Sequence, residues 1–156
     1  MEENCRISLE EIAVELGIDI EAAADIIEKS EKNGIIKRYR AVIDWDKLDD
    51  DDERTIAFIE VKVHPERDLG FDKIANRIKK FDEVQSLYLL SGSYDLHVVI
   101  QGKNIKEVAN FVSRKLSTLD SVQSTATHFL LKVYKIDGDI MNDEEDGSSR
   151  IPISAS

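Results

Sequence analysis

Cysteine is nearly absent from this sequence, and long apolar runs are missing altogether. The single cysteine, Cys5, has no second cysteine with which to form an internal disulfide and no partner at metal-ligand spacing. No apolar run approaches the roughly 18 residues that a membrane-spanning helix needs, and the acidic start Met1-Glu2-Glu3-Asn4 is unlike a signal peptide. These absences predict a cytoplasmic protein with no membrane partner.

Positive charge is also scarce, since 21 Lys and Arg face 32 Asp and Glu and the net charge is -11. Phosphate binding depends on Lys and Arg, so this balance argues against a protein that coats nucleic acid without specificity. Two acidic clusters, 49–53 and 143–146, lie where the hydrophobic pattern lapses. We interpret the first as an inter-domain linker and the second as part of a flexible acidic tail over 137–156.

Residues 1–48 are predicted to contain two helices. Ser8 and Glu11 form a capping box that opens a short helix, which Gly17 closes. Asp19 caps a second helix over 21–33, and Gly34 ends it. This arrangement is typical of a helix-turn-helix DNA-binding domain, although many two-helix corners share the spacing.

A strand-like run over 35–44 follows and carries Lys37, Arg38 and Arg40. Two interpretations stay open for these cations. They belong either to a solvated strand edge or to a wing that lies beside DNA phosphates.

Residues 54–136 repeat a strand-helix-strand pattern. Strand 55–63, helix 71–81, a hairpin centred on Gly92, a helix over 105–116 and strand 122–134 predict a ferredoxin-like βαββαβ domain in an α+β protein. Its four-stranded antiparallel sheet should carry both helices on one face. Several strands are apolar on both faces, however, as at Phe58, Val99, Phe129 and Leu131. The second face is therefore predicted to meet an identical sheet across a two-fold axis.

The three histidines give no sign of catalysis. His64, His97 and His128 are scattered over three strands, and the sequence has no Glu-x-x-His, no Cys-x-x-Cys and no Gly-rich phosphate loop. We predict no enzyme, no cofactor and no metal site.

Three segments together carry a family resemblance: Gly34-Ile35-Ile36-Lys37-Arg38-Tyr39-Arg40-Ala41-Val42-Ile43-Asp44, Ser91-Gly92-Ser93-Tyr94-Asp95 and Thr127-His128-Phe129-Leu130-Leu131-Lys132. With the helix-turn-helix, the chain resembles the Lrp/AsnC family of feast/famine regulators from Arg6 to Lys135. The resemblance implies a transcription regulator whose C-terminal domain dimerises through its sheet and often assembles to octamers. It also implies an amino acid or similar small effector bound at contacts between dimers.

The resemblance and the residue types together indicate two sets of site residues. For DNA they are Lys29, Lys32, Lys37, Arg38 and Arg40, and for the effector they are Ser91, Gly92, Ser93, Tyr94, Asp95, Thr125, Thr127 and His128. Gly92 permits a positive φ, and Asp95 is interpreted either as a local turn residue or as the partner of an effector ammonium group.

The sequence departs from the family at its start and in its second helix. Family members begin with an apolar helix, and residues 1–5 resemble only the end of it, so the first helix is expected to be missing. From its cap Asp19 to Gly34, the second helix region has five acidic residues against Lys29 and Lys32, which disfavours DNA contact. The alternative function is therefore a co-regulator that has lost DNA binding and acts through mixed oligomers. A related family of haem-precursor decarboxylases carries His and Asn where this turn has Gly92 and Asp95, which argues against that enzyme activity.

Overall fold

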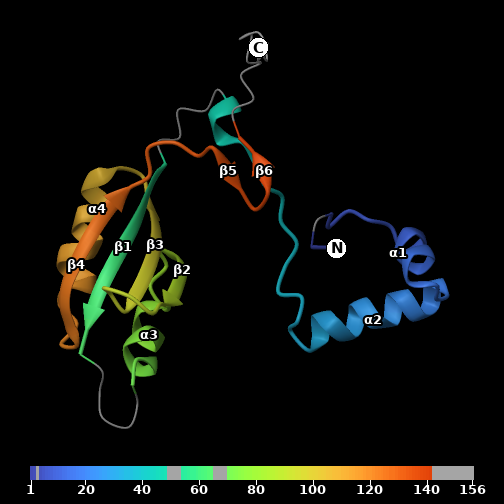
Figure 1. The fold of residues 1–156 in the computed structure, drawn as a ribbon, viewed down its shortest axis with the longest axis horizontal. Coiled ribbons are helices and arrows are strands. Elements are labelled where there is room, and N and C mark those ends of the chain that lie inside the picture. Colours follow the sequence, from blue (N-terminus) through green and yellow to red (C-terminus); the bar gives the residue numbers. More distant parts are fainter. Residues whose placement is uncertain (3, 49–53, 65–69, 142–156) are drawn as a thin grey trace, which may run out of the picture. The chain divides into compact units, whose positions relative to one another are not determined.

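The computed structural model describes residues 1–2, 4–48, 54–64 and 70–141. Both acidic clusters of the sequence, 49–53 and 143–146, lie outside the described residues. The chain divides into two compact units (Figure 1). One comprises Met1–Trp45 with Ile136–Asp139, and the other comprises Asp46–Lys135 together with the chain from Ile140.

The first unit contains the two predicted helices, α1 (Leu9–Leu16) and α2 (Ile20–Lys32). Ser8 accepts a hydrogen bond from the Glu11 N–H while the Glu11 carboxylate accepts one from the Ser8 N–H, so the capping box is present. Gly17 ends α1 with φ 65°, a left-handed conformation that glycine adopts without strain. The helix-turn-helix prediction is confirmed, and both helix starts lie where the capping residues place them.

Residues 35–44 form no strand, so the prediction of a strand in this segment is wrong. The start of the segment is fastened to α2, where Ile35 and Ile36 both donate to the Ser30 carbonyl. Ile35 is 75% exposed. A strand needs a neighbour to satisfy its amide and carbonyl groups, and none of the described strands pairs with this segment in the single chain. A short 3₁₀ turn, η1 (Trp45–Lys47), follows it.

The second unit is the predicted ferredoxin-like sandwich. Strands β1 (Thr55–Val63), β2 (Val84–Leu89), β3 (Leu96–Gly102) and β4 (Val122–Phe129) form an antiparallel sheet in the order β2-β3-β1-β4. Helices α3 (Asp72–Ile78) and α4 (Ile105–Phe111) cover one face, and α4 continues into the π-helical turn η2 (Val112–Leu116). The core between them buries thirteen hydrophobic residues, among them Ile59, Val98, Ile78 and Phe111. Both α3 and β4 are shorter than predicted, since the helix ends at Ile78 and the strand ends at Phe129.

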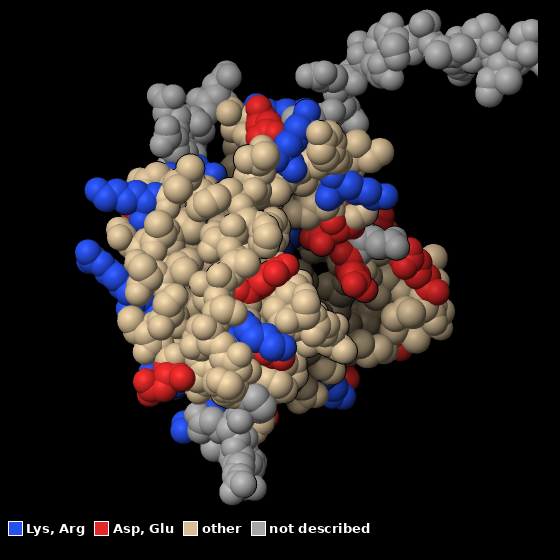
Figure 2. Space-filling model, turned by 60° about the vertical axis from the view of Figure 1, so that its left-hand side comes forward, with Lys and Arg blue, Asp and Glu red and all other residues tan. Residues whose placement is uncertain are grey.

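The strand register corrects the sequence-based assignment of residues to the two faces of the sheet. Phe129 pairs with Ala57, and Leu87 pairs with Val98, so both lie on the helix-covered side. The uncovered side, which we call the open face, carries Phe58, Glu60, Lys62, Tyr88, His97, Val99, Ala126 and His128. It is therefore a mixed aromatic, apolar and charged surface. Figure 2 shows one side of the molecule on which uncharged side chains cover a broad area and few charged ones interrupt it.

A small hairpin follows the sandwich. Strands β5 (Lys135–Ile136) and β6 (Asp139–Ile140) pair, and Met141 is buried while its N–H donates to the Tyr134 carbonyl. Regular structure thus extends past residue 137, where the sequence predicts the flexible tail to begin. None of the described helices is both long and apolar enough to cross a membrane.

Candidate functional site

The turn between β2 and β3, residues 91–95, is the predicted centre of the effector site. Leu90 and Asp95 close it through the Leu90 N–H and the Asp95 carbonyl, which lie 2.9 Å apart. Ser91, Gly92 and Ser93 are exposed. Gly92 does not adopt the positive φ that the sequence prediction allowed for, and a Cβ built on it meets no atom within 4 Å. The turn therefore presents its backbone and two hydroxyl groups to solvent.

Asp95 fastens this turn to the central strand β1. Its N–H donates to the Val61 carbonyl at 3.1 Å, and its Oδ2 accepts the Val63 N–H at 2.9 Å. The second carboxylate oxygen, Oδ1, lies 3.2 Å from the Lys62 Nζ. The Val63 hydrogen bond lowers the pKa of the Asp95 carboxyl below its ordinary value, and the Lys62 ammonium adds to this effect. Both oxygens of the predicted ammonium partner are thus already engaged within the chain.

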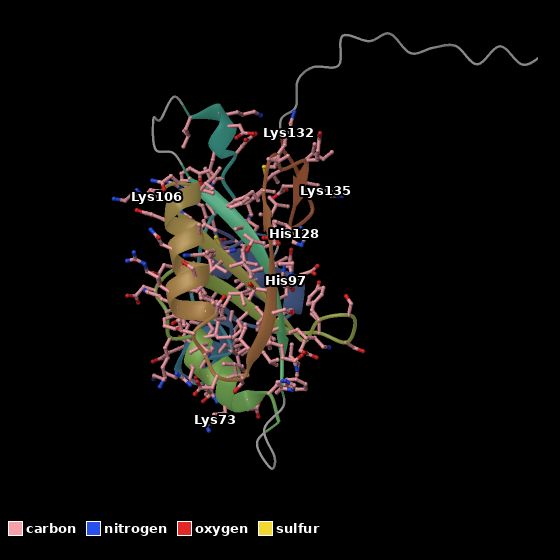
Figure 3. All side chains as sticks on the ribbon, turned by 90° about the vertical axis from the view of Figure 1, so that its left-hand side faces the viewer. Lys73, His97, Lys106, His128, Lys132 and Lys135 are labelled. Atoms are coloured by element: carbon pink, nitrogen blue, oxygen red, sulfur yellow. The ribbon has the colours of Figure 1, made fainter. Side chains whose placement is uncertain are left out.

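An aromatic cluster around His97 occupies the open face near the turn (His97 is labelled in Figure 3). The His97 ring stacks on Phe58 with centroids 5.6 Å apart, and the rings of Tyr94 and Tyr88 lie at 6.0 and 6.4 Å. The His97 Nδ1 is buried and makes no hydrogen bond within the described residues. Sequence reasoning treated His97 as a scattered histidine, because only the strand pairing reveals its aromatic neighbours.

The predicted effector residues of β4 do not share one face. Thr125 pairs with Val61 and Thr127 pairs with Ile59, which places both on the helix-covered side. His128 pairs with Phe58 on the open face, and its Nε2 lies 3.7 Å from the Glu60 carboxylate. The structure therefore brings Tyr94 and Asp95 together with the open face and separates Thr125 and Thr127 from His128.

The predicted DNA-contacting cations fall into two groups. Lys29 and Lys32 make ion pairs along α2, with Asp25 at 2.6 Å and Glu28 at 2.5 Å, and the hydrogen bond to Asp25 raises the pKa of Lys29. Lys37, Arg38 and Arg40 are exposed on the extended segment. Tyr39 anchors that segment, since its hydroxyl donates to the Glu31 carboxylate at 2.8 Å.

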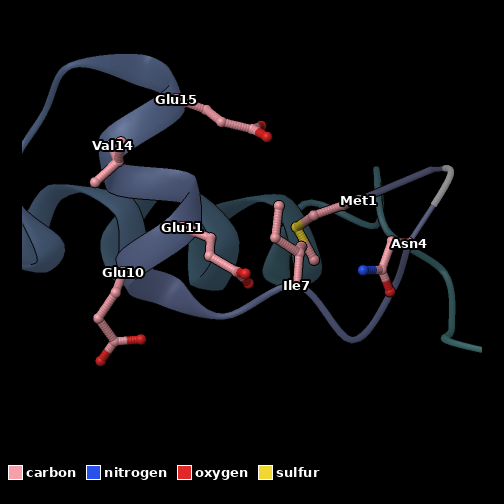
Figure 4. Close-up of a pocket in the computed structure, with 7 residues that line it drawn as sticks. All are labelled: Met1, Asn4, Ile7, Glu10, Glu11, Val14 and Glu15. Atoms are coloured by element: carbon pink, nitrogen blue, oxygen red, sulfur yellow. The ribbon is translucent and has the colours of Figure 1, made fainter.

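A shallow groove beside α1 is lined by Met1, Asn4, Ile7, Glu10, Glu11, Val14 and Glu15 (Figure 4). Val14 is 82% exposed there. The carboxylates of Glu10, Glu11 and Glu15 in its lining are negatively charged, so this part of the helix unit would repel phosphates.

Comparison with known proteins places this architecture among transcription regulators. Residues 56–140 match the model of the Lrp/AsnC ligand binding domain. The uncharacterized HTH-type transcriptional regulator YugG of Bacillus subtilis is 51% identical over 154 residues, which cover 99% of this chain and 92% of the relative. The HTH-type transcriptional regulator FL11 of Pyrococcus horikoshii is 31% identical over 127 residues, with 81% and 80% covered.

The fold agrees with that of a solved transcriptional regulator. The transcriptional regulator NMB0573 of Neisseria meningitidis, solved as a complex with L-Met, superimposes with a TM-score of 0.65 at 23% identity, covering 86% of this chain and 85% of that one. The relatives from Bacillus and Pyrococcus are regulators, in agreement with the prediction that the chain is not an enzyme. This chain belongs to the Lrp/AsnC family and is a helix-turn-helix transcriptional regulator.

Proposed function

We propose that this regulator is an oligomer, built from dimers, that binds DNA through its helix-turn-helix unit and responds to an amino acid or a similar small effector at its C-terminal unit. The observation that carries the proposal is the open face. Phe58, Tyr88, Val99 and the His97 ring lie on a four-stranded sheet whose other face is fully covered by helices. An uncovered sheet with aromatic residues at its centre favours a protein partner, and a second copy is the simplest one.

DNA contact in this proposal falls on the extended segment rather than on α2. Lys29 and Lys32 lie beside the Asp25 and Glu28 carboxylates of the same helix, and these carboxylates repel phosphates. Lys37, Arg38 and Arg40 keep exposed cationic groups. Three phosphate contacts per chain would give a dimer a salt slope of about -5, from roughly 0.9 per neutralised phosphate.

The effector in this proposal contacts the turn over 91–95. Its exposed hydroxyl and backbone groups suit a small polar ligand. The similar fold that was solved with L-Met supports an amino acid as the first class to test. Tyr94, Asp95 and His128 adjoin the open face, whereas Thr125 and Thr127 would contribute only from the other side of β4.

A gel shift on the chain's own promoter region, over a series of salt concentrations and with each of the twenty amino acids, tests the proposal. We expect binding that weakens steeply with salt and that changes with at least one amino acid. Absence of binding at low salt would instead support the co-regulator that acts through mixed oligomers.

Two matched variants locate the DNA contact. Arg38→Gln removes one exposed cation from the extended segment of each chain, so the magnitude of the salt slope should fall by about 1 per chain. Lys106→Gln removes an exposed cation from α4 in the other unit and should leave the slope unchanged.

A further inference from the structure

Because Asp95 already binds other groups of the chain, a charged group other than Asp95 has to recognise an effector at this turn. Its carboxylate oxygens bind the Val63 N–H and the Lys62 Nζ, and its side chain is only 17% exposed. An incoming ammonium group would have to share a carboxylate that already accepts the Val63 N–H and contacts the Lys62 ammonium, and little of that side chain reaches solvent. Asp95 is therefore a positioning residue for the turn rather than an open site for an ammonium group.

Lys62 is the accessible charge beside the same turn. Its side chain is 40% exposed on the open face. It is also the only Lys or Arg in the four strands β1 to β4, all of which the structure describes. Its bond to Asp95 is replaceable, because a partly exposed ion pair contributes little stability and Asp95 keeps the Val63 hydrogen bond.

We propose that Lys62 selects the effector by its carboxylate group, so that this site accepts carboxylic acids with or without an α-ammonium group, including 2-oxo acids. The inference rests on the proposed function, since it assumes that the effector contacts the turn over 91–95. The ammonium of Lys62 makes a charge-assisted hydrogen bond to the effector carboxylate, and the exposed hydroxyls of Ser91 and Ser93 are neutral donors on the same turn.

Glu60, the other carboxylate on the open face beside this turn, agrees with the roles given to Asp95 and Lys62. Glu60 lies two residues before Lys62 on β1, and its carboxylate faces the His128 Nε2 at 3.7 Å. Of the two charged side chains, Lys62 contacts a residue of the turn, Asp95, whereas Glu60 contacts His128 of β4.

Thermal unfolding of the full chain tests whether the effector is recognised by its carboxylate. Three probes that share one effector side chain are compared. The twenty L-amino acids are screened together with pyruvate, 2-oxoglutarate, 4-methyl-2-oxopentanoate and 4-methylthio-2-oxobutanoate. Each amino acid that stabilises the protein is then compared with its 2-oxo acid and its primary amide. We expect the 2-oxo acid to bind within about tenfold of the amino acid and the amide, which lacks the carboxylate, to give no shift.

Three variants assign the effect to Lys62. Lys62→Gln should weaken binding of both acids by about tenfold to a hundredfold, the range for a hydrogen bond to a charged group. Lys62→Arg, which keeps the charge, should restore most of the binding. Lys106→Gln removes an exposed lysine charge from α4 on the helix side and should leave binding unchanged (Lys106 is labelled in Figure 3).

The outcomes separate this inference from the proposed function. If an amide stabilises the wild-type chain as well as its amino acid does, or if Lys62→Gln binds like the wild type, the inference is overturned while the amino-acid response stands. If only 2-oxo acids bind and Lys62→Gln abolishes their binding, the inference holds and the proposed effector class changes. If no probe shifts the unfolding temperature, both are overturned.

Discussion

At the scale of single residues, Asp95 decides how the turn over 91–95 is held. One side chain joins two backbone segments that are more than thirty residues apart in sequence, through the Val63 N–H and the Lys62 ammonium. Hydrogen bonds to a charged acceptor are stronger than neutral ones, and this acceptor is largely shielded from water. The turn should therefore depend on the ionised form of Asp95.

Acid should weaken the wild-type fold through this residue. The folded-state pKa of Asp95 is depressed, so its contribution is present above the unfolded value of about 3.8 and is lost as the pH falls through the folded pKa. Asp95→Asn should cost about 1 kcal/mol at pH 7 and progressively less below pH 4. Urea unfolding at several pH values measures the difference, with Asp82→Asn, an exposed aspartate, as the control. An equal loss at pH 7 and pH 2.5 would contradict the role given to the carboxylate.

Gly92 offers a test of the effector surface that leaves the fold intact. Its φ is not positive, and a side chain built on it meets open space, so Gly92→Asp should fold normally. The added carboxylate would lie in the proposed site and repel an acidic effector. At a ligand concentration about a hundredfold above its dissociation constant, the wild type gains roughly 2.7 kcal/mol and the variant should gain none. Calorimetry with and without the effector found in the amino-acid screen measures both. An unchanged shift would leave the turn with a structural role only.

At the scale of elements, the helix unit depends on its caps because its core is small. Among its described residues the buried ones are Ile12, Ala13 and Ala23, against thirteen in the sandwich. Asp19 accepts the Ala22 N–H at 2.7 Å at the start of α2. A cap of this kind contributes about 1 kcal/mol, which is a large share of what so small a core can supply.

Amide exchange should reveal this difference between the two units. Amides of α1 and α2 should exchange faster than those of β1 and β3, because fewer buried contacts oppose local opening. Asp19→Ala should speed exchange across α2 by about fivefold, corresponding to roughly 1 kcal/mol. Glu28→Ala removes only an exposed ion pair with Lys32 and should change exchange little. Equal protection of both units would show that the helix unit has stability beyond its visible core.

The elements also show where sequence reasoning succeeds and where it fails. Ser8, Asp19 and Gly17 act through neighbours within a few residues, so they fix helix ends that can be predicted from the sequence. The faces of β2 and β4 could not be predicted in full, because the ladder is irregular between Val84 and Ser86 and again between Lys62 and Val63. Each irregularity moves the following side chains to the other face.

The same limit applies to the site. That the turn projects from a hairpin follows from its composition, but the partners of Asp95 lie on a strand far away in sequence. Lys62 carries no local signal that would set it apart from other strand lysines. Only the pairing of β1 with β3 and β4 shows that it adjoins the turn, on the same side as His97.

At the scale of the whole molecule, the proposed dimer covers the open face, and the strand register shows which residue tests this proposal. The sequence alone points to Phe129 or Leu131 as contact residues in a sheet-to-sheet dimer. Phe129 packs against the core on the helix side, so Phe129→Asp would damage the fold itself. Leu131 lies beyond the end of β4 and is 95% exposed. Val99, in contrast, lies half-buried on β3 within the open face.

Val99→Asp should therefore convert the dimer to a folded monomer. In the free chain the new carboxylate remains at a surface, whereas in the dimer it would be buried without a partner at a cost of several kcal/mol. Sedimentation at micromolar concentration should give a dimer or larger assembly for the wild type and a monomer for Val99→Asp, with similar far-ultraviolet circular dichroism. Ile105→Asp, at an exposed apolar position of α4, is the matched control and should sediment like the wild type. A wild-type monomer at these concentrations, or a Val99→Asp variant that still dimerises, would mean that the open face is not the dimer interface and that the exposed aromatic cluster serves another partner.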